Sequence, residues 1–226
     1  MNNVGEKYEM SYHLHTPWAD ILLQTTLPPI VLEKMIVISD KVLADSKRIN
    51  WGNNLAGQIK EEPLITPELL QNDNLIDFFG NAIIEYVHQC NLQKTSADHA
   101  ARIESAKEKE YNNVNIESMW IVEQQPGEYN PIHIHTNCDI STVMYLKVPI
   151  FLDSEKPERS DDGATYFIGD AGACSNLKHN MIKIIPKPGQ LFIFPSHMIH
   201  TVYPYKTNDN FARRSVSFNA SFEYKE

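Results

Sequence analysis

The second half of the chain constrains the fold most, because it is a succession of short β-rich runs separated by turn residues. From about residue 115 onward, β-branched, aromatic and other apolar residues gather into eight runs, each of the length of a single strand. Eight closely spaced strands predict a β-sandwich, a jelly roll or a barrel. The runs are ESMWIVEQ, IHIH, STVMYLKV, ATYFI, MIKIIP, QLFIFP, IHTVYPY and RSVSFNASF, and the turn residues between them include Pro126-Gly127, Asp161-Asp162-Gly163, Pro188-Gly189 and Asn208-Asp209-Asn210.

The first half of the chain has helical patterns instead. Apolar residues recur at helical spacing between Leu32 and Leu43. Thr66-Pro67-Glu68 is a good helix start, and an apolar stripe continues from it to about Cys90. The charged, alanine-rich stretch 96–110 fits either an exposed helix or a loop. We therefore expect a single domain over 1–226, in which a helical support region, 1–114, packs against a β core, 115–226.

Composition and charge exclude several classes of partner. The net charge is −9, so the chain lacks the basic excess that phosphate or an anionic membrane surface attracts. The three cysteines are an odd number without CxxC spacing, which indicates a reducing compartment. The sequence has neither a secretory signal pattern nor an apolar stretch near the ~20 residues that span a bilayer. We expect a cytoplasmic protein that binds neither nucleic acid nor membrane.

Three histidines form a candidate metal site. His133 and His135 lie in the run NPIHIHTN, and a strand would place both side chains on one face. His200 follows the apolar run QLFIFP about 65 residues later. Neutral imidazole binds iron, zinc, copper and nickel, so the ligand type alone does not identify the metal. His197 is near His200, but we expect it to line the entrance rather than to bind metal.

An arginine and a serine at the start of the last run form a candidate anion site. On a strand Arg213 and Ser215 face one side, with Ser217, while Arg214 faces the other. Guanidinium and a neighbouring hydroxyl can together hold a carboxylate. A metal face next to an anion clamp is what a metal-chelating dicarboxylate requires.

In these stretches the sequence resembles the 2-oxoglutarate/Fe(II) oxygenases, and in particular a family found in marine bacteria and in phages of cyanobacteria. The stretches that carry the resemblance are HIHTNCDISTVMYLKVP (133–149), PKPGQLFIFPSHMIHTVYP (186–204) and RRSVSFN (213–219). The resemblance covers about residues 115–222. It implies a mainly β fold with N-terminal helices, built as a double-stranded β-helix of the jelly-roll or cupin-like type. It also implies a dioxygenase, in the host cytoplasm if the chain is phage-encoded, with Fe(II) and 2-oxoglutarate as cofactors.

Carried over to this chain, the resemblance implies His133 and the residue two beyond it as proximal ligands, and His200 as the distal ligand. The usual superfamily pattern has Asp or Glu at the position of His135. Three arrangements are therefore open: three histidines, a site in which His135 does not bind, or a carboxylate from Asp139. Asp139 shares the face of His133 only if the strand continues through Asn137. We favour His135.

The resemblance also implies how the cosubstrate is held. Arg213, helped by Ser215, would bind the far carboxylate of 2-oxoglutarate. Tyr145 could donate a hydrogen bond to the same molecule, although a strand tyrosine more commonly packs. Alternation places either Met144 or Tyr145 inward, but not both.

We expect the substrate to be a small molecule, a peptide or a protein. The prolyl-hydroxylase-like layout favours hydroxylation of a peptidyl proline or similar side chain, chosen by the N-terminal helices and the loops at 150–163 and 170–180. Two alternatives stay open: a cupin-like three-histidine dioxygenase that does not use 2-oxoglutarate, and a non-enzymatic jelly roll with a binding or structural function. A zinc hydrolase would also use three histidines, but the sequence places no nearby glutamate as its general base. A homo-oligomer is compatible with the sequence.

Overall fold

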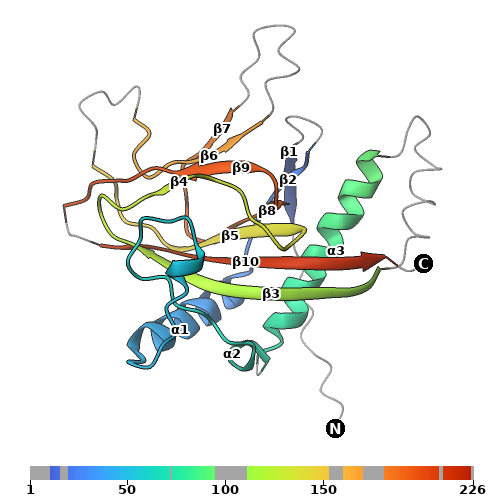
Figure 1. Cartoon of the computed structure of the whole chain (residues 1–226), viewed down its shortest axis with the longest axis horizontal. Helices are drawn as coiled ribbons and strands as arrows, with labels where there is room; N and C mark the ends of the chain where they lie inside the picture. The colour runs from blue at the N-terminus through green and yellow to red at the C-terminus, as the bar shows by residue number, and fades with distance from the viewer. Residues whose placement is uncertain are drawn as a thin grey trace, which may run out of the picture.

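The computed structural model consists of two antiparallel sheets with helices packed on one side (Figure 1). It describes residues 11–15, 20–71, 73–94, 111–152, 160–169, 181–208 and 211–224. The helices are α1 (Pro29–Ala44), the 3-10 helix η1 (Gly52–Asn54), α2 (Pro67–Gln71) and α3 (Leu75–Lys94). The strands are β1 (Tyr12–His15), β2 (Leu22–Thr26), β3 (Tyr111–Gln124), β4 (Asn130–His133), β5 (Ile140–Lys147), β6 (Thr165–Ile168), β7 (Met181–Ile184), β8 (Gln190–Pro195), β9 (Ile199–Val202) and β10 (Arg213–Tyr224).

The strands form the double-stranded β-helix that the sequence predicted. The larger sheet has the order β1-β2-β8-β5-β10-β3, and the smaller has the order β4-β9-β6-β7. In Figure 1 the smaller sheet lies above the larger sheet, and α1 and α2 lie below the larger sheet. Neighbours in the sheets are distant in sequence, as in β2 beside β8 and β5 beside β10, which is characteristic of a jelly roll.

Two hydrophobic cores hold these layers together. The first lies between the large sheet and the helices, where Phe79 and Ile83 of α3 pack with Phe218 of β10. The second, smaller core lies on the other face of the large sheet and includes Tyr145, Phe167 and Phe192. Burying each large apolar side chain contributes about 2 kcal/mol, so the first core supplies most of the stability. Some residues of the second core, Tyr145 among them, also line the polar pocket described below.

The eight predicted strands are all present, but the first half of the chain differs from its expected all-helical character. It contributes β1 and β2 to the large sheet. The sequence did not predict the strand Leu22–Thr26. A short strand that is buried on both faces lacks the alternation of apolar and polar residues by which a strand is recognised. Leu22 packs into the second core and Leu23 into the first.

The helix expected from Thr66 to Cys90 is two helices. α2 ends at Gln71 and α3 begins at Leu75, and between them Asn74 has a φ of 54°. That left-handed conformation ends the helical path, and asparagine tolerates it better than most residues. The stretch 96–110 lies outside the described residues. In the part of the chain that is described, no helix is both long and apolar enough to cross a membrane.

Candidate metal centre

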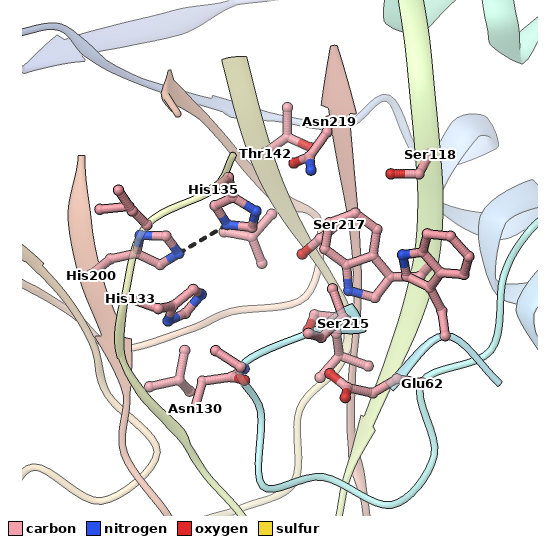
Figure 2. A pocket seen from close by; sticks show the side chains of 18 of the residues that line it. Glu62, Ser118, Asn130, His133, His135, Thr142, His200, Ser215, Ser217 and Asn219 are labelled. Carbon is pink, nitrogen blue, oxygen red and sulfur yellow. Dashed lines mark hydrogen bonds between the residues drawn. The ribbon is translucent and has the colours of Figure 1, made fainter. Parts of the chain in front are cut away.

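The three predicted histidines converge at one point of the smaller sheet (Figure 2). His133 ends β4, and its register partner on β9 is His200. One ligand atom from each of the three rings lies within 4.8 Å of the others, and the Nε2 atoms of His135 and His200 are 3.3 Å apart. The strand expected to run through His135 stops at His133. The backbone N–H of His135 instead donates to Ser196 O at 2.9 Å, and this contact keeps the side chain turned toward the other two.

Backbone carbonyls orient two of the rings. His133 Nδ1 lies 2.7 Å from Pro131 O, and His200 Nδ1 lies 2.8 Å from Met198 O. A carbonyl can only accept, so each Nδ1 carries its proton and each Nε2 presents a lone pair. Partners of this kind fix the tautomer of a metal-binding histidine.

Burial keeps the three imidazoles neutral. It lowers the pKa of His133 and His200, and it lowers the pKa of His135 to about 4, where the nearby His133 ring adds to the effect. Neutral imidazole is the form that binds a divalent metal, so near pH 7 no proton has to leave first. Three nitrogen donors on one side of an ion leave further coordination positions open. The donor set therefore fits Fe(II), although by itself it also fits other divalent metals.

Asp139 is not part of the cluster. Its Oδ2 accepts the backbone N–H of Phe222 at 3.1 Å, on β10 rather than in the pocket. Asn137 has a φ of 60°, so the strand does not run on through it and the condition for a shared face fails. His197 does not line the pocket either; it is exposed and lies 3.3 Å from Asp20 Oδ2.

The histidines open onto a cavity of about 490 Å³ between the two sheets. Alternate residues of β10 line it, as the strand pattern predicted, while the residues between them pack into the first core or form ion pairs. The lining residues of β10 are Arg213, Ser215, Ser217 and Asn219.

Arg213 is a buried cation without a counter-ion. Its side chain is 1% exposed, and among the described residues no carboxylate lies within ion-pair distance. Nη1 donates to Gly163 O at 2.7 Å, Nη2 donates to the Gln124 side chain, and Nε has no partner in the part of the chain that the structure describes. Desolvation lowers its pKa, which reflects the cost of an uncompensated buried charge. A carboxylate bound in the pocket would offset that cost.

Arg214 shows the contrast on the other face of β10. It forms ion pairs with Glu123, at 2.6 Å, and with Asp40 on α1. Those carboxylates raise its pKa, so the charge of Arg214 is already compensated. Of the two neighbouring arginines, only Arg213 faces the pocket with hydrogen-bonding capacity to spare.

Tyr145 and Ser215 lie close to Arg213 in the same pocket. The Tyr145 hydroxyl is 2.6 Å from Thr165 Oγ1, and its ring centroid is 5.8 Å from Arg213 Cζ. Met144 packs in the first core, so the alternation places Tyr145 inward. Ser215 lines the cavity as its register beside Tyr145 requires.

Glu62 is a pocket residue that the sequence did not reveal. It is 1% exposed, its Oε2 has no hydrogen-bond partner among the described residues, and burial raises its pKa to about 7. Trp51 and Trp120 line the same cavity. In the run EEPLITP nothing distinguishes this glutamate from a surface residue, because its burial depends on a loop that folds back on β3.

Comparisons with known proteins agree with this geometry. Residues 118–219 match the model of a family described as "Putative 2OG-Fe(II) oxygenase", a range that contains the three histidines and Arg213. No curated protein sequence matches the chain.

Solved structures of low sequence identity share the fold. A prolyl-4-hydroxylase of Pseudomonas putida has a TM-score of 0.54 at 15% identity, over 90% of this chain and 92% of that one. A prolyl hydroxylase of Trichoplax adhaerens, solved with a hypoxia inducible factor peptide, has a TM-score of 0.53 at 11% identity, over 88% and 83%. The α-ketoglutarate dependent epimerase SnoN from nogalamycin biosynthesis has a TM-score of 0.52 at 10% identity, over 91% and 81%. Over residues 118–219 the chain thus matches the 2-oxoglutarate/Fe(II) oxygenases, and the protein is an enzyme of that class with Fe(II) and 2-oxoglutarate as its cofactors.

Proposed function

We propose that the protein is a hydroxylase in which His133, His135 and His200 hold Fe(II) and Arg213 binds the far carboxylate of 2-oxoglutarate. The observation that carries the assignment is the pairing of three neutral imidazoles with a buried, uncompensated guanidinium in one cavity. When bound, the metal and cosubstrate supply oxidative decarboxylation of 2-oxoglutarate coupled to oxidation of a substrate C–H bond.

The side chains of the pocket bind and orient rather than transfer protons. Arg213 provides a free Nε–H beside two N–H groups that already hold backbone and amide oxygens, so its plane is fixed before the carboxylate arrives. Ser215 provides a second donor on the same face of β10. The Tyr145 hydroxyl, held by Thr165, supports the same end of the cosubstrate.

Direct binding measurements test this assignment. Fe(II) and 2-oxoglutarate are added anaerobically to the purified protein, and the weak visible charge-transfer band of the chelate is recorded. Arg213→Met should weaken 2-oxoglutarate binding by at least 100-fold without changing iron affinity, because it removes a charge-assisted contact from a buried guanidinium. Arg214→Lys is the matched control: it keeps the charge, lies one residue away and points out of the pocket.

Iron affinity of single variants tests the ligand set. His135→Ala and His200→Ala should each weaken Fe(II) binding sharply, whereas Asp139→Asn should not, because that side chain hydrogen-bonds to Phe222. Iron binding that survives His135→Ala unchanged would reduce the set to two histidines. If iron binds but 2-oxoglutarate changes neither the spectrum nor succinate formation, the assignment of Arg213 is wrong and the three-histidine dioxygenase without 2-oxoglutarate replaces it.

A peptidyl proline or similar side chain is the substrate class first expected. Two of the similar structures are prolyl hydroxylases, and one of them was solved with a peptide. Most of the two loops expected to choose the substrate lies outside the described residues, so that expectation stays a prediction, as do the cytoplasmic location and the oligomeric state.

A further inference from the structure

One wall of the pocket is formed by a segment that runs beside β3. Three backbone hydrogen bonds hold residues 61–65 antiparallel to it: Glu123 N to Glu61 O at 3.0 Å, Ile121 N to Pro63 O at 2.9 Å, and Ile65 N to Met119 O at 2.8 Å. In this register Leu64 lies opposite Trp120. Alternation then places Glu62 on the same face as Trp120, toward the cavity, and Glu61 on the opposite face.

Glu62 faces the cavity with unused hydrogen-bonding capacity. Figure 2 shows it across the pocket from the three histidines, with its carboxyl group directed inward. The preceding loop approaches it closely at Gly57, where an added Cβ would lie 3.0 Å from Glu62 Oε1 and 2.4 Å from Asn130 Oδ1. Two oxygen acceptors, from Glu62 and Asn130, therefore border the same small space. Burying a carboxylate whose oxygen accepts no hydrogen bond costs free energy. A donor that binds to that oxygen offsets the cost, and a cationic donor offsets it most.

The remaining charge of the pocket also favours a cation. Among the described residues its charged lining is Glu62, Glu117 and Arg213, with no lysine. The proposed function assigns Arg213 to the cosubstrate, and the histidines are neutral. The part of the cavity left for the substrate is therefore negative, and Glu128 adds a further negative charge near Glu62.

Two tryptophans complete the surroundings of Glu62. Trp51 and Trp120 both line the cavity and belong to one small hydrophobic cluster. The Trp120 ring centroid is 6.0 Å from that of His135, so this cluster reaches the metal centre. Indole faces attract ammonium and guanidinium groups more strongly than other aromatic rings do.

We propose that Glu62, together with Trp51 and Trp120, binds a cationic group of the substrate, an ammonium or a guanidinium. The contact holds the substrate so that carbon atoms near its charged end lie toward the three histidines. The cation can belong to a lysine or arginine side chain of a peptide or to a free amine. The role of the bound substrate and the assignment of Arg213 to the cosubstrate rest on the proposed function, whereas the contacts around Glu62 do not.

Binding to the metal-free protein tests the site without any turnover. The probes are n-butylammonium, n-butylguanidinium, n-butanol and butyrate, which differ in charge at similar size. Binding is followed by tryptophan fluorescence and checked by calorimetry. We expect both cations to bind at least 10-fold more tightly than butanol, and butyrate not to bind at this wall. Equal binding of butanol and n-butylammonium would overturn the proposal.

Single substitutions test whether Glu62 is the residue that gives the preference for cations. Glu62→Gln should reduce cation binding to the level of butanol, and Trp51→Leu should weaken it several-fold while leaving a preference for charge. The matched control is Glu61→Gln, which removes the same charge from the neighbouring residue, on the other face, where Glu61 pairs with Arg48. Retained cation preference in Glu62→Gln, or its loss in Glu61→Gln, would contradict the assignment. Near-UV circular dichroism checks that each variant is folded.

Failure of this proposal can be told apart from failure of the proposed function. Glu62→Gln should form the Fe(II)–2-oxoglutarate band as the parent does. If the parent protein forms the Fe(II)–2-oxoglutarate band but binds cations no better than butanol, only the cation site is wrong. If it prefers cations but forms no band, only the cofactor assignment is wrong. N-acetyl-glycyl-lysyl-glycine amide is compared with n-butylammonium to separate the two sources: at least 10-fold tighter binding of the peptide indicates a polypeptide substrate, and equal binding indicates a free amine.

Discussion

Replacing Glu62 by glutamine should make the free protein more stable in alkaline solution, and the size of the effect follows from burial. Desolvation, with repulsion from Glu128, raises the pKa of Glu62 from 4.5 to about 7. Between these values the folded protein keeps a proton that the unfolded chain releases, so stability falls as pH rises through this range. The full difference corresponds to about 3 kcal/mol at 1.36 kcal/mol per pKa unit. Because water can enter the cavity that Glu62 faces, we expect about half of it to be realised.

Urea denaturation at pH 5 and pH 8.5 measures this effect. The gain of Glu62→Gln over the parent should be near zero at pH 5 and about 1–2 kcal/mol at pH 8.5. Glu61→Gln, which loses a half-buried ion pair that solvent still screens, should change stability by less than about 1 kcal/mol at either pH. A Glu62→Gln protein that is less stable than the parent at pH 8.5 would refute the reasoning, because it would mean that the ionised carboxylate has a stabilising partner in the folded state.

Three further changes probe separate parts of the structure. Gly57→Ala should weaken n-butylammonium binding at least 10-fold and leave iron affinity unchanged in calorimetry, because the new Cβ would collide with Asn130 Oδ1. Arg214→Met should lower the free energy of unfolding by roughly 2–3 kcal/mol in urea, because it leaves Glu123 without its partner, while 2-oxoglutarate affinity stays the same. Tyr145→Phe should weaken 2-oxoglutarate binding about 3- to 10-fold in the anaerobic titration, which is the worth of about one hydrogen bond, and should not alter iron binding.

The β core could be predicted because its physical signals are local. Each strand from β3 to β10 contains a short β-rich run, and the two histidines of NPIHIHTN are close enough in sequence to be recognised as a pair. The alternation that places Arg213 and Ser215 in the pocket, and Arg214 outside it, also depends only on neighbouring residues.

Other features depend on contacts between distant segments. β2 joins the large sheet, between β1 and β8, only because β8 pairs with it, and its own sequence carries no alternation. Glu62 is buried only because residues 61–65 lie along β3. His135 reaches the metal centre from beyond the end of its strand, through a contact with Ser196 that strand periodicity does not describe. In each case the deciding contact joins residues more than about 50 positions apart.

The alternation along β10 separates the residues that hold the fold from those that can change the ligand. Val216, Phe218 and Ala220 are fixed by the first core, whereas Ser217 and Asn219, between them, face the cavity. Asn219 Oδ1 has no hydrogen-bond partner in the described ranges, so replacing Asn219 breaks no described hydrogen bond of that atom. Variation at positions 217 and 219 can therefore alter what the pocket accepts without repacking the domain. A library randomised at these two positions alone is thus a direct way to diversify this oxygenase, with foldability retained by the intervening residues.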